Sequence, residues 1–132
     1  MEQKCKVKLD IFSEVLECDE ISRRIGISPT RIINKGMSRG KSPVLRHKEN
    51  IWSFESDISI RQDIDQHIER LRETLGIYAS KIFELKPACS IQCTCVVESE
   101  DAPVLNLAPE LIGFLSSMGA SLDIDLYFGN SN

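Results

Sequence analysis

The chain has 132 residues and a formal net charge of −4, and 42% of its residues are hydrophobic and 27% charged. These values are typical of a globular domain and predict a single domain over residues 1–132, while the negative charge argues against a nucleic-acid partner. Because no apolar run approaches the roughly 20 residues of a membrane helix and no secretory signal begins the chain, we expect a cytoplasmic protein without a membrane partner.

The first half of the chain predicts three strands and one short helix. Alternating apolar and polar residues, or short apolar runs between turn signals, indicate strands at residues 5–11, 30–34 and 51–56. The helix lies between the first two strands, because Asp19 can cap its start and Gly26 suits the position after its end. Trp52 and Phe54 share one face of the third strand and are expected in the core.

Residues 59–86 predict the longest helix. Its apolar side chains recur at alternating steps of four and three residues and so form one stripe: Ile64, Ile68, Leu71, Leu75, Tyr78, Ile82 and Leu85. A capping box could begin the helix at either Ser59 or Asp63, and Pro87 limits its end. We expect the stripe to cover a sheet, although the same spacing also suits a coiled coil, so both a monomer and a homodimer remain open.

The second half predicts three further strands and a second short helix. The strands are expected at residues 89–97, 104–107 and 122–128. The helix begins at Pro109, ends at Gly119 and turns four side chains inward: Leu111, Ile112, Leu115 and Met118. The complete order predicts an α+β fold, a two-layer sandwich in which one long and two short helices cover one face of a mainly antiparallel sheet.

Several motifs recur in one known family. They are Asp19-Glu20-Ile21-Ser22, Gly26-Ile27-Ser28-Pro29-Thr30, Lys35-Gly36, Ile51-Trp52-Ser53-Phe54-Glu55-Ser56, Leu107-Ala108-Pro109-Glu110-Leu111 and Leu122-Asp123-Ile124-Asp125-Leu126-Tyr127. With the long amphipathic helix between them, they resemble the bacterial domain of unknown function 4279 family over nearly the whole chain. The resemblance implies a small bacterial protein, assigns no catalytic residue and leaves the function open.

The cysteines and histidines suggest no metal site. The chain has five cysteines, an odd number, and lacks the spacing of a disulfide-rich scaffold. Cys89, Cys93 and Cys95 share one strand face and are expected to pack as small apolar residues against the long helix. His47 and His67 have no evident catalytic partner and are expected at the surface. We therefore predict neither a metal nor a cofactor.

A basic segment is the first candidate binding site. Residues 35–48 hold five of the chain's 16 Lys and Arg residues and none of its 20 Asp and Glu residues. The five are Lys35, Arg39, Lys41, Arg46 and Lys48. Such a patch on an acidic body suits an anion or an acidic protein surface. We therefore expect a non-enzymatic protein-binding module of an immunity or regulatory type, whose contact is this loop or the wet face of the sheet.

A group of carboxylates supports an alternative function. Asp123 and Asp125 share the polar face of the last strand, and Glu55 is expected on a neighbouring strand. Two nearby carboxylates can perform acid–base chemistry, so the alternative is a small hydrolase or a ligand-binding enzyme. A simpler explanation is that these side chains form the solvated face of the sheet and keep its edge from pairing.

Overall fold

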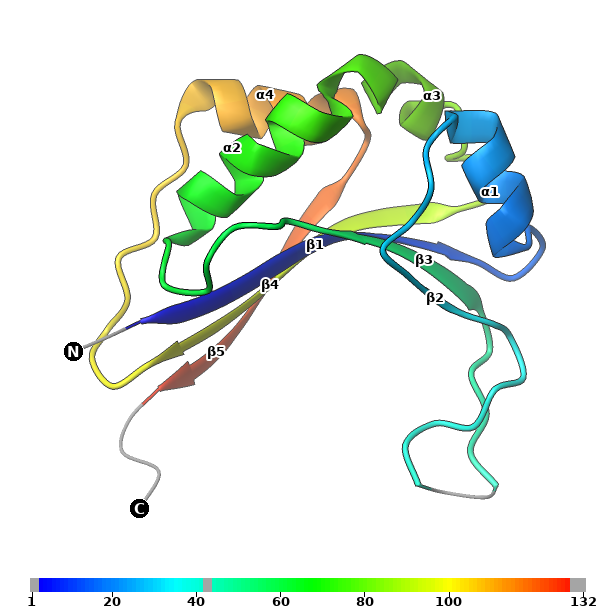
Figure 1. Cartoon of the computed structure of the whole chain (residues 1–132), viewed down its shortest axis with the longest axis horizontal. Helices are drawn as coiled ribbons and strands as arrows, with labels where there is room; N and C mark the ends of the chain where they lie inside the picture. The colour runs from blue at the N-terminus through cyan, green and yellow to red at the C-terminus, as the bar shows by residue number, and fades with distance from the viewer. Residues whose placement is uncertain (1–2, 42–43, 129–132) are drawn as a thin grey trace.

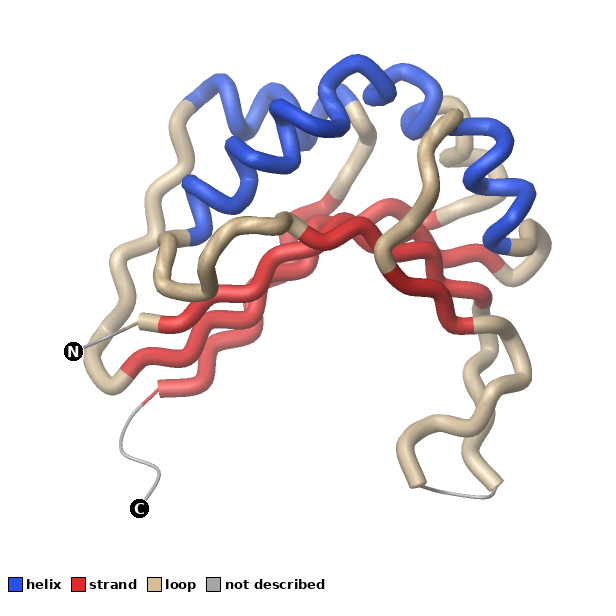
Figure 2. The backbone as a smooth tube through the Cα atoms, viewed as in Figure 1, coloured by secondary structure: helices blue, strands red, loops and turns tan. Residues whose placement is uncertain are grey.

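The computed structural model describes residues 3–41 and 44–128 and shows a curved sheet with helices on one of its faces (Figures 1 and 2). The strands are β1 (Lys4–Ser13), β2 (Arg31–Ile33), β3 (Asn50–Glu55), β4 (Ser90–Ser99) and β5 (Ser121–Phe128). The helices are α1 (Cys18–Ile25), α2 (Ile64–Leu75), α3 (Ala79–Phe83) and α4 (Pro109–Ser117), and the 3₁₀ turn η1 (Gly76–Tyr78) joins α2 to α3. The predicted α+β class is confirmed.

The sheet is mixed, with the strand order β2-β3-β1-β4-β5. The pairs β1–β3, β1–β4 and β2–β3 are antiparallel, as expected, whereas β4 and β5 are parallel. A parallel pair requires the chain to return to the starting end of β4, and α4 lies on that return path. The strand predicted at residues 104–107 is wrong, because this segment is a loop that leads from β4 to α4 and pairs with no strand among the described residues (Figure 2).

The predicted long helix is divided into α2, η1 and α3, but its apolar side chains still form one stripe along these elements. Its start is settled at Asp63, whose backbone N–H donates to Oε1 of Gln66 at 3.0 Å in a capping box. At Gly76, a poor helix former, the chain tightens into η1 before α3 continues. All stripe side chains are buried except Tyr78, which is half-buried. They pack with the apolar residues of β1 and β4 in one core.

The smaller helices close the core at its ends. Trp52 is fully buried, its Nε1 donates to Oγ of Ser22 in α1 at 3.0 Å, and its ring stacks on Phe54. In α4 the prediction for Ile112 is wrong, because this side chain is 55% exposed and Phe114 is buried in its place. The positions 111, 114, 115 and 118 share one helical face, whereas position 112 is rotated away from it.

All five cysteines are free thiols buried in the core. Burial raises the pKa of Cys5, Cys18 and Cys89. The pKa of Cys93 is also raised, by its hydrogen bond with Cys95 and by burial. The prediction that Cys89, Cys93 and Cys95 are buried as small apolar side chains is confirmed.

The other face of the sheet, here called the uncovered face, is covered by none of the described helices (Figure 2). Its side chains follow from the strand registers: Arg31 and Ile33; Ile51, Ser53 and Glu55; Lys4, Lys6, Lys8, Asp10 and Phe12; Ser90, Gln92, Thr94, Val96 and Glu98; Ser121, Asp123, Asp125 and Tyr127. Within the described ranges, no helix combines the length and the apolar character needed to cross a bilayer.

Candidate functional site

A bulge after β3 opens the sheet beside β1. The Ser56 N–H donates to the Val7 carbonyl at 3.0 Å, as the β1–β3 register requires. The same register would place Ile58 opposite Cys5, but the Cys5 N–H donates instead to the Ile60 carbonyl at 2.7 Å. The residues between therefore loop out of the ladder. Bulges of this kind redirect side chains and commonly lie next to functional sites.

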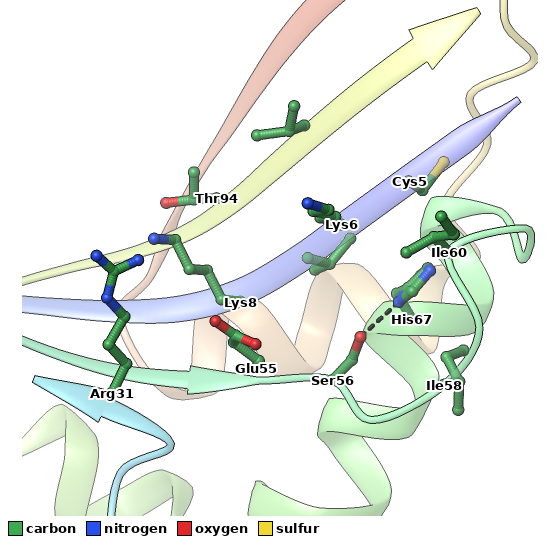
Figure 3. A pocket seen from close by; sticks show the side chains of 12 residues that line it. Cys5, Lys6, Lys8, Arg31, Glu55, Ser56, Ile58, Ile60, His67 and Thr94 are labelled. Atoms are coloured by element: carbon green, nitrogen blue, oxygen red, sulfur yellow. Dashed lines mark hydrogen bonds between the residues drawn. The ribbon is translucent and has the colours of Figure 1, made fainter.

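Two side chains of α2 hold the bulge in place. Nε of Arg70 donates to Oδ1 of Asp57 at 2.7 Å, and this pairing lowers the pKa of Asp57. His67 lies behind the bulge, and its Nδ1 is hydrogen-bonded to Oγ of Ser56 (Figure 3). The expectation of a surface histidine is wrong, since His67 is only 1% exposed.

The environment of His67 favours a neutral ring. Burial lowers the pKa of His67, although the backbone carbonyls of Gln62 and Ser59 and the charge of Asp63 act in the opposite direction. In a neutral ring only one nitrogen carries a hydrogen, and the tautomer decides whether Nδ1 accepts from the Ser56 hydroxyl or donates to it. Nε2 is buried without a hydrogen-bond partner in the described part of the chain.

A cavity of about 340 Å³ lies between the bulge and the uncovered face (Figure 3). Its charged side chains come from three strands: Lys6 and Lys8 of β1, Arg31 of β2 and Glu55 of β3. Its apolar lining comes from the bulge and from neighbouring strands, and includes Cys5, Val7, Ile58, Ile60 and Val96. In Figure 3, Arg31, Lys8 and Glu55 gather at one end of this group, and Ile58 and Ile60 lie at the other.

Asp10 fixes the polar centre of the uncovered face. It is buried on the central strand and accepts hydrogen bonds from Oγ of Ser53 at 2.5 Å and Oγ1 of Thr94 at 2.7 Å. Nζ of Lys8 lies 3.7 Å from Oδ1 of Asp10. These partners satisfy the carboxylate and join three strands, so this residue has a structural role. The sequence placed Asp10 on the polar side of its strand but gave no sign of its burial.

The predicted basic site forms a projecting arm. Residues 34–41 and 44–49 extend β2 and β3 into a hairpin, here called the basic arm, which projects beyond the sheet on the side away from the helices (Figure 1). Gly36, His47 and Arg39 donate backbone hydrogen bonds across it, to His47, Met37 and Leu45, at 2.8–3.0 Å. Ser42 and Pro43 lie outside the described residues.

All five predicted basic residues lie on the basic arm, and all are exposed: Lys35, Arg39, Lys41, Arg46 and Lys48. Arg46 donates to Oγ of Ser38 across the hairpin at 2.5 Å, and Nζ of Lys35 donates to the Glu14 carbonyl at 3.2 Å. The structure therefore gathers these cations on one hairpin.

The predicted carboxylates are not gathered in the same way. Asp123 and Asp125 are exposed on β5, on the uncovered face. Glu55 occupies the same cross-strand row as Asp123, but Lys8 and Thr94 stand between them. Three strand spacings separate the two, about 14 Å. Glu55 is thus not on a strand next to the aspartates, and it cannot act on one small group together with them. No set of three potential metal-ligating side chains lies together among the residues that the structure describes.

Sequence patterns alone did not predict the cavity or the residues that line it. His67 lies between Ile64 and Ile68 in the helical pattern, so its position at the edge of the apolar stripe could have indicated burial. Lys6 and Lys8 alternate with apolar residues and only indicate a solvated strand face. Neither the bulge nor the approach of Arg31 leaves a local signal in the sequence.

Comparison with known proteins gives a family and no activity. No curated protein matches the chain, and no solved structure does. The family model described as "Domain of unknown function (DUF4279)" matches residues 3–129, nearly the whole chain. This range includes every motif on which the resemblance rests. The chain is a member of the domain of unknown function 4279 family.

Proposed function

We propose that this protein is a binding module of a regulatory or immunity type, which uses the basic arm to hold an acidic surface of a partner protein. The observation that carries the proposal is the projection of the arm, with its exposed cations, away from the rest of the fold (Figure 1). A hairpin held by its own cross-strand hydrogen bonds loses less conformational freedom on binding than a free loop does.

Charge and apolar surface occur together on the basic arm. None of the chain's 20 Asp and Glu residues falls within residues 35–48, so the arm is basic while the body is acidic. Met37 and Leu45 are 47% and 54% exposed among these cations. Exposed Met and Arg side chains are characteristic of protein interfaces, in which apolar contact supplies affinity and charge supplies orientation. An acidic partner surface with an apolar centre fits this arrangement.

The test compares two charge-matched variants. Arg39→Ala/Lys41→Ala removes one arginine and one lysine from the basic arm. Arg23→Ala/Lys81→Ala removes the same two residue types from exposed helical positions on the opposite side of the sheet. Each immobilised protein is exposed to lysate of the source organism, and the retained proteins are identified by mass spectrometry and eluted with increasing salt.

We expect the parent and Arg23→Ala/Lys81→Ala to retain one acidic protein in stoichiometric amount. Arg39→Ala/Lys41→Ala should not retain it. Its retention should weaken as ionic strength rises from about 0.1 to 0.5 M, because exposed charge pairs are screened. Equal retention by both variants would exclude the basic arm as the contact.

A further inference from the structure

We propose that the cavity between β1 and the bulge is a second binding site, which takes a small carboxylate with an apolar body. This site is distinct from the basic arm, and nothing in the proposed protein contact depends on it. Its volume of about 340 Å³ lies within the range of small-molecule pockets.

The charge of the cavity favours a monoanion. Lys6, Lys8 and Arg31 line it, against Glu55, while Asp10 lies beside Lys8. Neither Lys6 nor Arg31 forms an ion pair with any residue that the structure describes. Three cations against two carboxylates leave one positive charge to be balanced. A carboxylate can accept hydrogen bonds from the guanidinium of Arg31 and from a lysine at once.

The positions of the cations set the orientation of the ligand. Ser56 is hydrogen-bonded to His67 and carries no charge that could balance an anion. Arg31 and Lys8 lie at the other end of the lining group, so the anionic group lies there (Figure 3). The apolar body then extends toward Ile58 and Ile60, which line the other end (Figure 3).

The bulge makes this cavity a built feature rather than a gap in the sheet. His67 and Arg70 of α2 hold Ser56 and Asp57, so two hydrogen-bonded side chains attach the wall to this helix. Ile58 follows directly and lines the cavity from this fixed segment. A preformed wall lowers the entropic cost of binding a small ligand.

The experiment uses hexanoate as the probe and hexan-1-ol as its uncharged counterpart. Each is titrated into the ¹⁵N-labelled full chain, and the amide signals are followed by NMR. The variants Lys6→Gln and Arg31→Gln each remove one cavity cation at an exposed position. Lys4→Gln is the matched control, because Lys4 lies on the same strand and face as Lys6 but does not line the cavity.

We expect hexanoate to shift the amide signals of residues 5–8 and 56–60, with a Kd on the order of 1 mM. Lys6→Gln and Arg31→Gln should each weaken binding by about tenfold, whereas Lys4→Gln should change it less than twofold. Arg39→Ala/Lys41→Ala should bind hexanoate like the parent, which separates this site from the basic arm. No shift up to about 20 mM, equal binding of hexan-1-ol, or equal weakening by Lys4→Gln would each overturn the proposal.

Discussion

Replacing Leu71 by Ala tests whether the stripe of α2 and α3 provides the stability of the fold. Leu71 is 1% exposed, and α2 packs on the central strand β1. Truncation removes buried carbon atoms and leaves a cavity that the surrounding strands can fill only in part. Such substitutions cost roughly 2–5 kcal/mol, and the complete burial of Leu71 supports a value of about 3 kcal/mol or more.

Ile77→Ala is the matched control for this measurement. Ile77 belongs to the same continuous helical segment, but it is 84% exposed, so its truncation should change stability by less than about 0.5 kcal/mol. Urea unfolding of the two variants and the parent, with equal m-values, gives the differences directly. The Tm of Leu71→Ala should fall by roughly 10 °C. If Leu71→Ala were no less stable than Ile77→Ala, the stripe would not cover the sheet.

Three further predictions concern His67, two glycines and the buried thiols. Because folding lowers the pKa of His67, the unfolded chain binds a proton more readily, and stability should fall as pH decreases below about 6.5 toward the folded pKa. Urea unfolding between pH 7.5 and 5 should show a smaller loss for His67→Gln, and equal losses would contradict the burial argument. Gly119 has φ 69°, so Gly119→Ala should cost about 1–2 kcal/mol. Gly76 has a right-handed backbone conformation with open space around it, so Gly76→Ala should stabilise the protein by up to about 1 kcal/mol. Thermal melts of both glycine variants measure this, and a shift of Tm in the same direction for both would refute the argument. The five buried thiols should react with a maleimide at the rate of global unfolding, whereas rapid labelling of the native protein would show that the core is open.

The sequence predicted those elements whose side chains have a strong period. The stripe from Ile64 to Leu85 and the alternation of β1 and β4 specify one buried face each, and these faces meet in the structure. On the edge strand β5 only Ile124 packs against this core, whereas Leu122 and Leu126 are exposed. Pro109 at the start of α4 and Gly26 after α1 were likewise recognisable, because each has a conformational preference that few other residues share.

The errors have a common physical origin in packing between distant segments. An apolar run such as residues 104–107 has no intrinsic partner, so only the path from β4 to α4 decides that it is not a strand. Burial of His67 and Asp10 depends on hydroxyl groups contributed by other strands or by the bulge. The cavity combines residues from β1, β2, β3 and β4, whose adjacency is a property of the sheet order.

The basic arm was the part of the candidate site most accessible to sequence reasoning. Its cations are close together in the chain, so their proximity needed no knowledge of the fold. Glu55, Asp123 and Asp125 required a strand order, and the order places β1 and β4 between them. Local clusters of charge are therefore better predicted here than sites assembled across the sheet.

The position of β1 at the centre of the sheet has a consequence for biosynthesis. This first strand is flanked by β3 and β4, and the latter ends only at Ser99. During translation, β1 leaves the ribosome first and keeps unpaired edges until β3 and β4 have been synthesised. β5 can pair with β4 only after that. Contacts of such long sequence separation slow folding and expose apolar strands to aggregation. We therefore expect nascent chains that stop before β4 to depend on chaperones, whereas the finished chain does not.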